Sequence, residues 1–126
     1  MRERRIGKRV HEEAQAAVTV LAAENAAELE NKTFFCPTEN LSVTGLRLSV
    51  QVPVPVGSIL ELRIAFAKPL RSFQHSGRVV WIRRDDEGRL AHALGIEFTH
   101  VSAEVEDAWR DMISLKLKRQ GAIVDD

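Results

Sequence analysis

Alternating apolar and polar residues predict that most of this chain forms β-strands. In GLRLSVQV, three apolar side chains share one face and polar residues lie between them: Leu46, Leu48 and Val50. In ILELRIAFA, residues 59–67, apolar side chains again occupy every second position. Successive side chains of a strand point to opposite faces, so this period of two is typical of a half-buried strand. The prolines and Gly57 between the two segments predict an extended loop.

Weaker signals complete the set of strands. Residues 14–23 combine alanines, which favour helix, with Val and Thr, which favour strand, and we interpret them as a strand. TFFCPTEN begins as a strand that we expect to end at Pro37, because proline cannot donate a ladder hydrogen bond. GRVVWIRR and LAHALGIEFTHV flank the turn signal DDEG and predict a hairpin of two long strands.

The hydrophobic period changes after Ser102. Apolar residues now recur at spacings of three and four, which predicts one apolar stripe on a helix: Val105, Ala108, Trp109, Met112 and Ile113. Ser102 is a suitable N-cap, and acidic residues near the start and basic residues near the end suit the helix dipole. About six strands followed by one helix predict a mainly β fold, in which the sheet closes into a small barrel and the helix packs on it. The stripe alone leaves a homodimer or partner interface open.

Composition limits the function classes. The chain has 126 residues, enough for one domain, and its 18 Lys and Arg balance its 18 Asp and Glu. Attraction for an anion must therefore come from local clustering, and residues 1–9 hold five cations against one acid, as in an exposed arm. The single cysteine, Cys36, excludes an internal disulfide and suggests a small buried hydrophobe in a reducing cytosol. With no run of roughly 20 apolar residues and no secretory signal, we expect a cytoplasmic protein without a membrane span.

Candidate catalytic residues are few. The four histidines lack the spacing of a zinc site, so we interpret them as surface or strand-edge residues. Asp85 and Asp86 precede Gly88 and are explained by turn chemistry. Ser42 lacks the flanking pattern of a nucleophile, and the chain contains neither of the two common glycine-rich phosphate-binding motifs. We therefore expect no enzymatic activity and no bound metal.

Two polar clusters are suited to ligand binding. Arg5 and Arg9 stand four residues apart with Arg4 adjacent, and guanidinium groups pair with phosphate oxygens, with guanine edges and with base faces. Asn40 and Ser42, at a spacing of two, offer hydrogen-bonding groups on one side of an extended segment. Gly45 permits a positive φ or a close approach of a ligand to the backbone. Each cluster alone also fits a solvated arm or a self-capped turn.

In this order, the two clusters resemble the PilZ domain family, bacterial receptors for cyclic di-GMP. The family pattern is an RxxxR arm followed by [D/N]xSxxG, here Arg5–Arg9 and Asn40–Gly45. GRVVWI, LGIEF and a helix after the last strand extend the resemblance over residues 4–120. It implies a six-stranded antiparallel β-barrel with a C-terminal α-helix. The implied parts are a flexible basic arm over 1–12, a barrel over 13–101 and a helix over 102–120.

The resemblance also implies the roles of the site residues. Arg5 and Arg9 would hold the phosphates and guanines of cyclic di-GMP, Asn40 and Ser42 would bond its other side, and Gly45 would keep the turn tight. Arg4 is an extra donor, which we expect to favour a stacked pair of ligands over a single one. Asn at position 40 lacks the negative charge of the commoner Asp, which predicts weaker binding. No other cofactor is implied. The arm would become ordered on the ligand and signal to an effector protein in trans, in motility, pilus or exopolysaccharide machinery.

Two alternatives remain from the sequence. One is a PilZ-like protein-interaction module without ligand binding, against which the intact motifs argue. The other is a small barrel that binds single-stranded nucleic acid through the basic arm, Phe34 and Phe35. Against that, the net charge is zero, only seven aromatics are present, and four of them fit core positions better: Phe34, Phe66, Phe98 and Trp81. We therefore expect no nucleic acid polymer as a partner.

Overall fold

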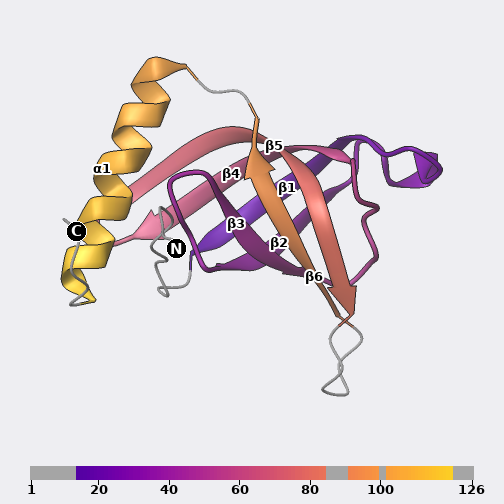
Figure 1. The fold of residues 1–126 in the computed structure, drawn as a ribbon, viewed down its shortest axis with the longest axis horizontal. Coiled ribbons are helices and arrows are strands. Elements are labelled where there is room, and N and C mark those ends of the chain that lie inside the picture. Colours follow the sequence, from indigo (N-terminus) through magenta and orange to yellow (C-terminus); the bar gives the residue numbers. More distant parts are fainter. Residues whose placement is uncertain (1–13, 85–90, 100–101, 121–126) are drawn as a thin grey trace, which may run out of the picture.

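A computed structural model describes residues 14–84, 91–99 and 102–120 of the chain. In this part of the chain, antiparallel strands form a closed barrel with a helix at one end (Figure 1). The strands are β1 (Gln15–Ala22), β2 (Thr33–Glu39), β3 (Gly45–Val50), β4 (Ile59–Ala67), β5 (Leu70–Arg84) and β6 (His92–Phe98), with a short 3-10 helix, η1 (Ala27–Leu29), and the C-terminal helix α1 (Ala103–Arg119). The order around the barrel is β1-β2-β3-β6-β5-β4. The predicted six-stranded antiparallel barrel with a C-terminal helix is confirmed.

The core follows from the alternation in the sequence. On β4 every second side chain points inward and is buried: Leu60, Leu62, Ile64 and Phe66. The inward-facing side chains of β3 are also buried, and Leu48 of this strand lies opposite Leu94 of β6. Each fully buried aliphatic side chain of this kind contributes roughly 1.5–3 kcal/mol. Phe34 and Phe98 pack against the core while partly exposed, and Cys36 is buried as expected.

Two strands differ from their predicted bounds. β2 continues through Pro37 to Glu39. The N–H of Thr38 donates to the Ala14 carbonyl on the β1 side, and successive N–H groups of a strand point to opposite neighbours. The missing N–H of Pro37 therefore faces β3, with which β2 pairs only at Thr38 and Glu39, so no ladder bond is lost.

β5 is the second strand that differs. It begins at Leu70, well before the predicted GRVVWIRR segment, and pairs with β4 in a long hairpin. The pattern is obscured because the inward positions of this first half include His75 and Gly77 rather than only bulky apolar residues. The predicted pairing of β5 with β6 is confirmed, and the DDEG turn between them lies outside the described residues.

Helix α1 begins as predicted. The Ser102 side chain accepts a hydrogen bond from the Val105 N–H at 3.2 Å and caps the first turn. The predicted apolar stripe is confirmed as a packing face, since it is buried against the barrel at Trp109, Met112 and Ile113. No helix in the described ranges has the length and apolar character needed to cross a membrane.

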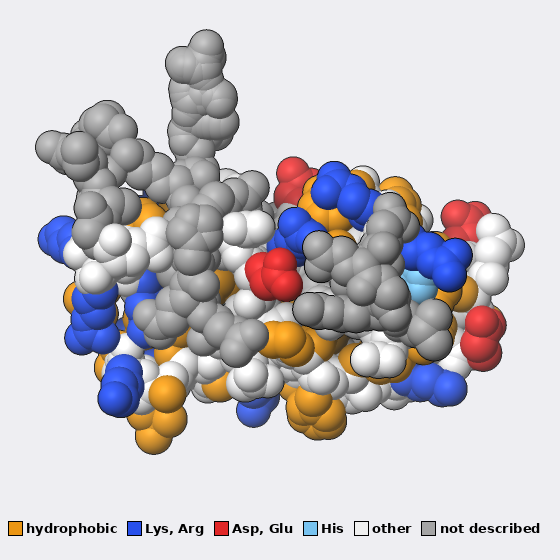
Figure 2. Space-filling model, turned by 90° about the horizontal axis from the view of Figure 1, so that it is seen from below, with side chains coloured by type: hydrophobic (Ala, Val, Ile, Leu, Met, Phe, Trp, Pro, Cys, Tyr) orange, Lys and Arg blue, Asp and Glu red, His pale blue; other side chains and the backbone are white. Residues whose placement is uncertain are grey.

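The far end of α1 is fixed to the turn between β4 and β5. Lys116 Nζ and Arg119 donate to the Lys68 carbonyl at 2.5 and 2.9 Å. Lys116 is buried, and its ammonium also lies 5.1 Å from the centre of the Phe66 ring. Figure 2 shows Lys and Arg side chains both at the end of the molecule where α1 lies and, beside Asp and Glu side chains, over the rest of that face.

Candidate functional site

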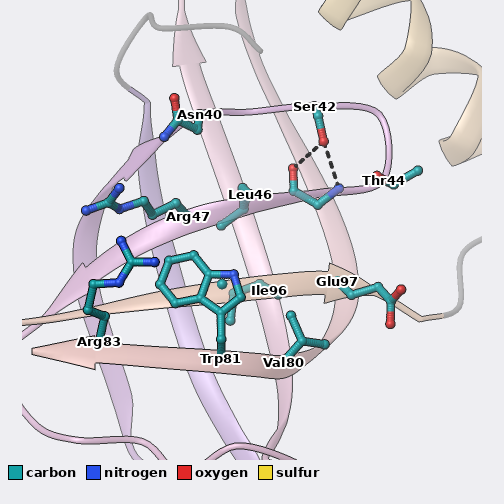
Figure 3. A pocket seen from close by; sticks show the side chains of 12 residues that line it. Asn40, Ser42, Thr44, Leu46, Arg47, Val80, Trp81, Arg83, Ile96 and Glu97 are labelled. Atoms are coloured by element: carbon teal, nitrogen blue, oxygen red, sulfur yellow. Dashed lines mark hydrogen bonds between the residues drawn. The ribbon is translucent and has the colours of Figure 1, made fainter. Parts of the chain in front are cut away.

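A cavity of about 440 Å³ opens on the outer face of the barrel, where β3, β6 and β5 are neighbours (Figure 3). The turn before β3 forms one wall, and residues of the three strands form the floor and the opposite wall. The lining residues are Asn40, Ser42, Thr44, Gly45, Leu46, Arg47, Val80, Trp81, Arg83, Gly95, Ile96 and Glu97. Three residues predicted from the sequence, Asn40, Ser42 and Gly45, are therefore brought together at one cavity.

The first wall is a turn closed on itself. The Ser42 N–H donates to the Gly45 carbonyl at 2.9 Å. The Ser42 hydroxyl accepts from the Gly45 N–H at 3.2 Å and lies 3.1 Å from the Gly45 carbonyl, to which it can donate. Asn40 enters the turn with a φ of 50°, a left-handed conformation that Asn tolerates better than most residues. The Asn-x-Ser-x-x-Gly spacing is thus required by the turn itself.

This geometry gives Ser42 and Gly45 structural roles in addition to the predicted ligand contacts. Ser42 is only 1% exposed, and its hydroxyl is occupied by Gly45, so its first role is to hold the turn. Of the two explanations that the sequence left open for Gly45, a positive φ does not apply. A Cβ at this position would lie 2.1 Å from the Ile96 carbonyl oxygen of β6. Glycine is needed because two strands approach closely. Ligand contact by Ser42 and Gly45 remains a prediction.

The opposite wall is built on strand register. Arg47 of β3 pairs with Gly95 of β6, and Gly95 pairs with Trp81 of β5, so the three lie in one row across the sheet. The Trp81 indole covers Gly95, where an added Cβ would meet its Nε1 at 2.1 Å. A register irregularity between Val79 and Trp81 places the ring there. Trp81 was expected in the core; instead it is half-buried in this wall.

Two guanidinium groups flank the Trp81 ring. Cζ of Arg83 lies 5.0 Å and Cζ of Arg47 lies 6.0 Å from its centre, within cation–π range. Arg47 is also held by Glu39 of β2, at 3.4 Å between Nε and Oε1. Figure 3 shows both guanidinium groups beside the indole, across the cavity from the turn. Such a surface can stack on a planar base and attract phosphate oxygens.

The sequence alone did not identify Arg47, Trp81, Arg83 or Gly95 as site residues. Trp81 and Gly95 lie within GRVVWI and LGIEF, and Arg47 lies on the polar face of its strand, so each carried a weak signal. Their convergence depends on β3, β6 and β5 being neighbours in register. The predicted residues Arg4, Arg5 and Arg9 lie outside the described residues, and their roles remain predictions.

Among the described residues, His75 is a titratable residue in unusual surroundings. It is 2% exposed, contrary to the expected surface or strand-edge position, and stacks on Phe98 at 4.0 Å between ring centres. Burial lowers its pKa from 6.5 to about 4, and burial likewise raises the pKa of the Cys36 thiol to about 11. Neither residue lines the cavity. Across the described ranges, no group of His, Cys, Asp and Glu side chains is arranged to hold a metal ion.

The fold and this cavity define a class of small closed β-barrels that carry a polar turn opposite an aromatic and cationic wall. The PilZ domain model matches residues 3–114, and the chain belongs to the PilZ domain family. That match covers most of the predicted arm, the turn, the six described strands and most of α1. No curated protein matches the sequence.

Solved structures share the fold at low sequence identity. The PilZ domain of Escherichia coli YcgR, solved with c-di-GMP, is 18% identical, with a TM-score of 0.66 and 94% of each chain covered. Bacillus subtilis MotI (DgrA), an inhibitor of motility, is 16% identical with a TM-score of 0.70, and K. pneumonia MrkH in its apo state is 15% identical with 0.67. The match covers 94% of this chain in both cases, but only 52% of MotI and 55% of MrkH. This chain therefore spans about half the length of those two proteins.

Proposed function

We propose that this protein is a receptor for cyclic di-GMP that acts as an adaptor without chemistry of its own. One observation carries the proposal: the Asn40–Gly45 turn and the Trp81 ring, with its two guanidinium groups, form opposite walls of one cavity. Membership of the PilZ family supports the choice of ligand, as does the similarity to the YcgR PilZ domain, which was solved with c-di-GMP.

The cavity suits the chemistry of this ligand. Cyclic di-GMP combines two phosphates with two guanines, so a binding site needs cations, a stacking surface and hydrogen-bond partners. Arg47 and Arg83 supply positive charge beside the Trp81 indole, on which a guanine stacks. Asn40 offers both an acceptor and donors at the rim of the turn. Glu97, on the lining, provides a carboxylate that can accept from guanine N–H groups.

Arg4, Arg5 and Arg9 complete the proposed site from the arm. Ordering a residue costs about 1–2 kcal/mol of backbone entropy, and a hydrogen bond to a charged group returns roughly 1.5–3 kcal/mol. A few such bonds to the phosphates offset the ordering of the segment that carries them. Ligand binding and arm ordering are then coupled, and the new surface is available to an effector protein in trans. We propose that this signalling takes place in the bacterial cytoplasm.

Isothermal titration calorimetry with cyclic di-GMP tests the proposal. The variants are Arg5→Ala in the arm and Trp81→Leu in the cavity, and the control is Arg63→Ala, an exposed arginine of β4 that bonds Gln74 and does not line the cavity. We expect saturable binding by the wild type and the control, and a loss of at least tenfold in both site variants. Stoichiometry distinguishes one ligand from a stacked pair.

The outcomes separate the proposal from its alternatives. An unchanged melting temperature at saturating cyclic di-GMP, with no calorimetric signal, would indicate an interaction module without ligand binding. Affinity for any oligonucleotide that falls steeply with salt would indicate a nucleic-acid-binding barrel instead. Equal binding by Arg63→Ala and Trp81→Leu would show that the ligand binds outside this cavity.

A further inference from the structure

A buried contact joins the C-terminal helix to the turn that forms one wall of the cavity. The indole Nε1–H of Trp109 on α1 donates to the Ser42 carbonyl at 2.9 Å, across 67 residues of sequence. Both residues are 1% exposed, so water is excluded from this bond. Ser42 is the residue that closes the turn through its own N–H and hydroxyl. Trp109 therefore holds the Ser42 carbonyl, and with it the turn that forms one wall of the cavity.

A second contact holds the same turn from β6. The Phe98 N–H donates to the Thr44 carbonyl at 2.9 Å. The Phe98 ring stacks on His75 and meets Trp109 edge-on, with centres 5.7 Å apart. Trp109 also packs edge-on against Phe73 at 5.2 Å. The indole is thus held in one orientation by an aromatic cluster, which sets the position of its N–H.

We infer that Trp109 is a positioning residue that couples α1 to the ligand-binding turn. The choice of cyclic di-GMP as the ligand rests on the proposed function. The inference that Trp109 positions the turn does not depend on that ligand. Because the turn can bind a ligand well only in one arrangement, a docked α1 raises ligand affinity. By thermodynamic linkage, a bound ligand strengthens the docking of α1 by the same factor. Occupancy of the cavity is thereby transmitted to a helix whose opposite, charged face is exposed.

The test compares Trp109→Phe with Phe73→Leu. Trp109→Phe keeps a ring in the cluster and removes the N–H donor, whereas Phe73→Leu disturbs the same cluster and leaves the donor in place. In both variants without ligand, NMR measures hydrogen exchange of the Gly45 amide, which bonds the Ser42 hydroxyl. Calorimetry then measures cyclic di-GMP affinity. In the wild type, exchange of the Trp109 indole N–H is measured with and without cyclic di-GMP.

We expect faster Gly45 exchange and an affinity loss on the order of tenfold in Trp109→Phe, and clearly smaller changes in Phe73→Leu, which loosens the cluster but keeps the donor. Cyclic di-GMP should slow indole exchange in the wild type. If Trp109→Phe folds and matches the wild type in Gly45 exchange and affinity, or if both variants lose equally, the coupling is overturned. If the wild type itself does not bind cyclic di-GMP, the proposed function fails, and Gly45 exchange still decides whether Trp109 positions the turn.

Discussion

Replacing Gly45 by alanine is expected to destabilise the barrel through the backbone of β6. A Cβ at this position would lie 2.1 Å from the Ile96 carbonyl oxygen and 3.2 Å from its carbonyl carbon. Ordinary van der Waals contact begins near 3.4 Å, so the oxygen must move by about 1.3 Å. The obstacle belongs to the main chain of a paired strand, so no side-chain rotation relieves it.

The magnitude follows from two costs. Overpacking a well-packed site costs typically 1–3 kcal/mol, because neighbouring backbone has to shift. The Ile96 carbonyl belongs to the residue of β6 that pairs with Leu46 of β3, and disturbing that pairing adds about 1 kcal/mol. We therefore expect Gly45→Ala to lower the free energy of unfolding by roughly 2–4 kcal/mol, a large part of the stability of an ordinary domain.

Urea denaturation followed by circular dichroism measures this loss. Gly57→Ala is the matched control: Gly57 has a φ of 95° and open space around its Cα, so alanine meets strain but no contact. We expect the control to lose about 1 kcal/mol. If Gly45→Ala were as stable as the wild type yet no longer bound cyclic di-GMP, the glycine would serve ligand approach, and the reasoning from strand contact would be refuted.

Three further predictions concern the cavity wall, the buried histidine and the helix start. Gly95→Ala should displace the Trp81 indole, whose Nε1 would lie 2.1 Å from the added Cβ, and should therefore weaken cyclic di-GMP binding. The free energy of unfolding should fall by only about 1 kcal/mol, because the half-buried ring can swing outward. Calorimetry and denaturation measure the two effects, and an unchanged affinity would contradict the prediction. Burial lowers the pKa of His75 from 6.5 to about 4, so the unfolded chain gains a proton at a higher pH than the folded one, and the free energy of unfolding should fall by about 3 kcal/mol as the pH drops from 6.5 to 4. His75→Leu should remove this part of the pH dependence, measured by denaturation at several pH values. An equal pH dependence in the variant and the wild type would disprove the prediction. Ser102→Ala should cost about 1 kcal/mol and Ser102→Asp should restore it, measured as the shift in thermal unfolding.

Local patterns determined the secondary structure and the fold class. β3 and β4 were predicted with their inward faces because burial acts on every second residue of a strand, whatever its neighbours are. The cap at Ser102 and the packing stripe of α1 followed from helical spacing for the same reason. The motif at Asn40–Gly45 was visible because a turn is a local structure, closed here by bonds between Ser42 and Gly45.

Strand order and register decided which residues form the aromatic wall of the cavity, which the hydrophobic pattern of the sequence could not predict. Trp81, Gly95 and Arg47 form one row only because β5, β6 and β3 are adjacent in this alignment. The sequence spacing between them says nothing about which strands are neighbours. A shift of one residue would turn each of these side chains to the other face of the sheet. The aromatic wall of the cavity is therefore a property of the closed barrel.

The sequence by itself determined which segments are strands or helix, where the charge gathers, and which two motifs resemble a PilZ receptor, since each depends on residues close together in the chain. Only the tertiary structure decided that His75 is buried, that Gly45 serves strand contact, and that Trp109 bonds Ser42 from 67 residues away. The physical reason is that burial, close approach and long-range hydrogen bonds are set by the closure of the barrel and the docking of α1, which bring together residues that the chain keeps apart.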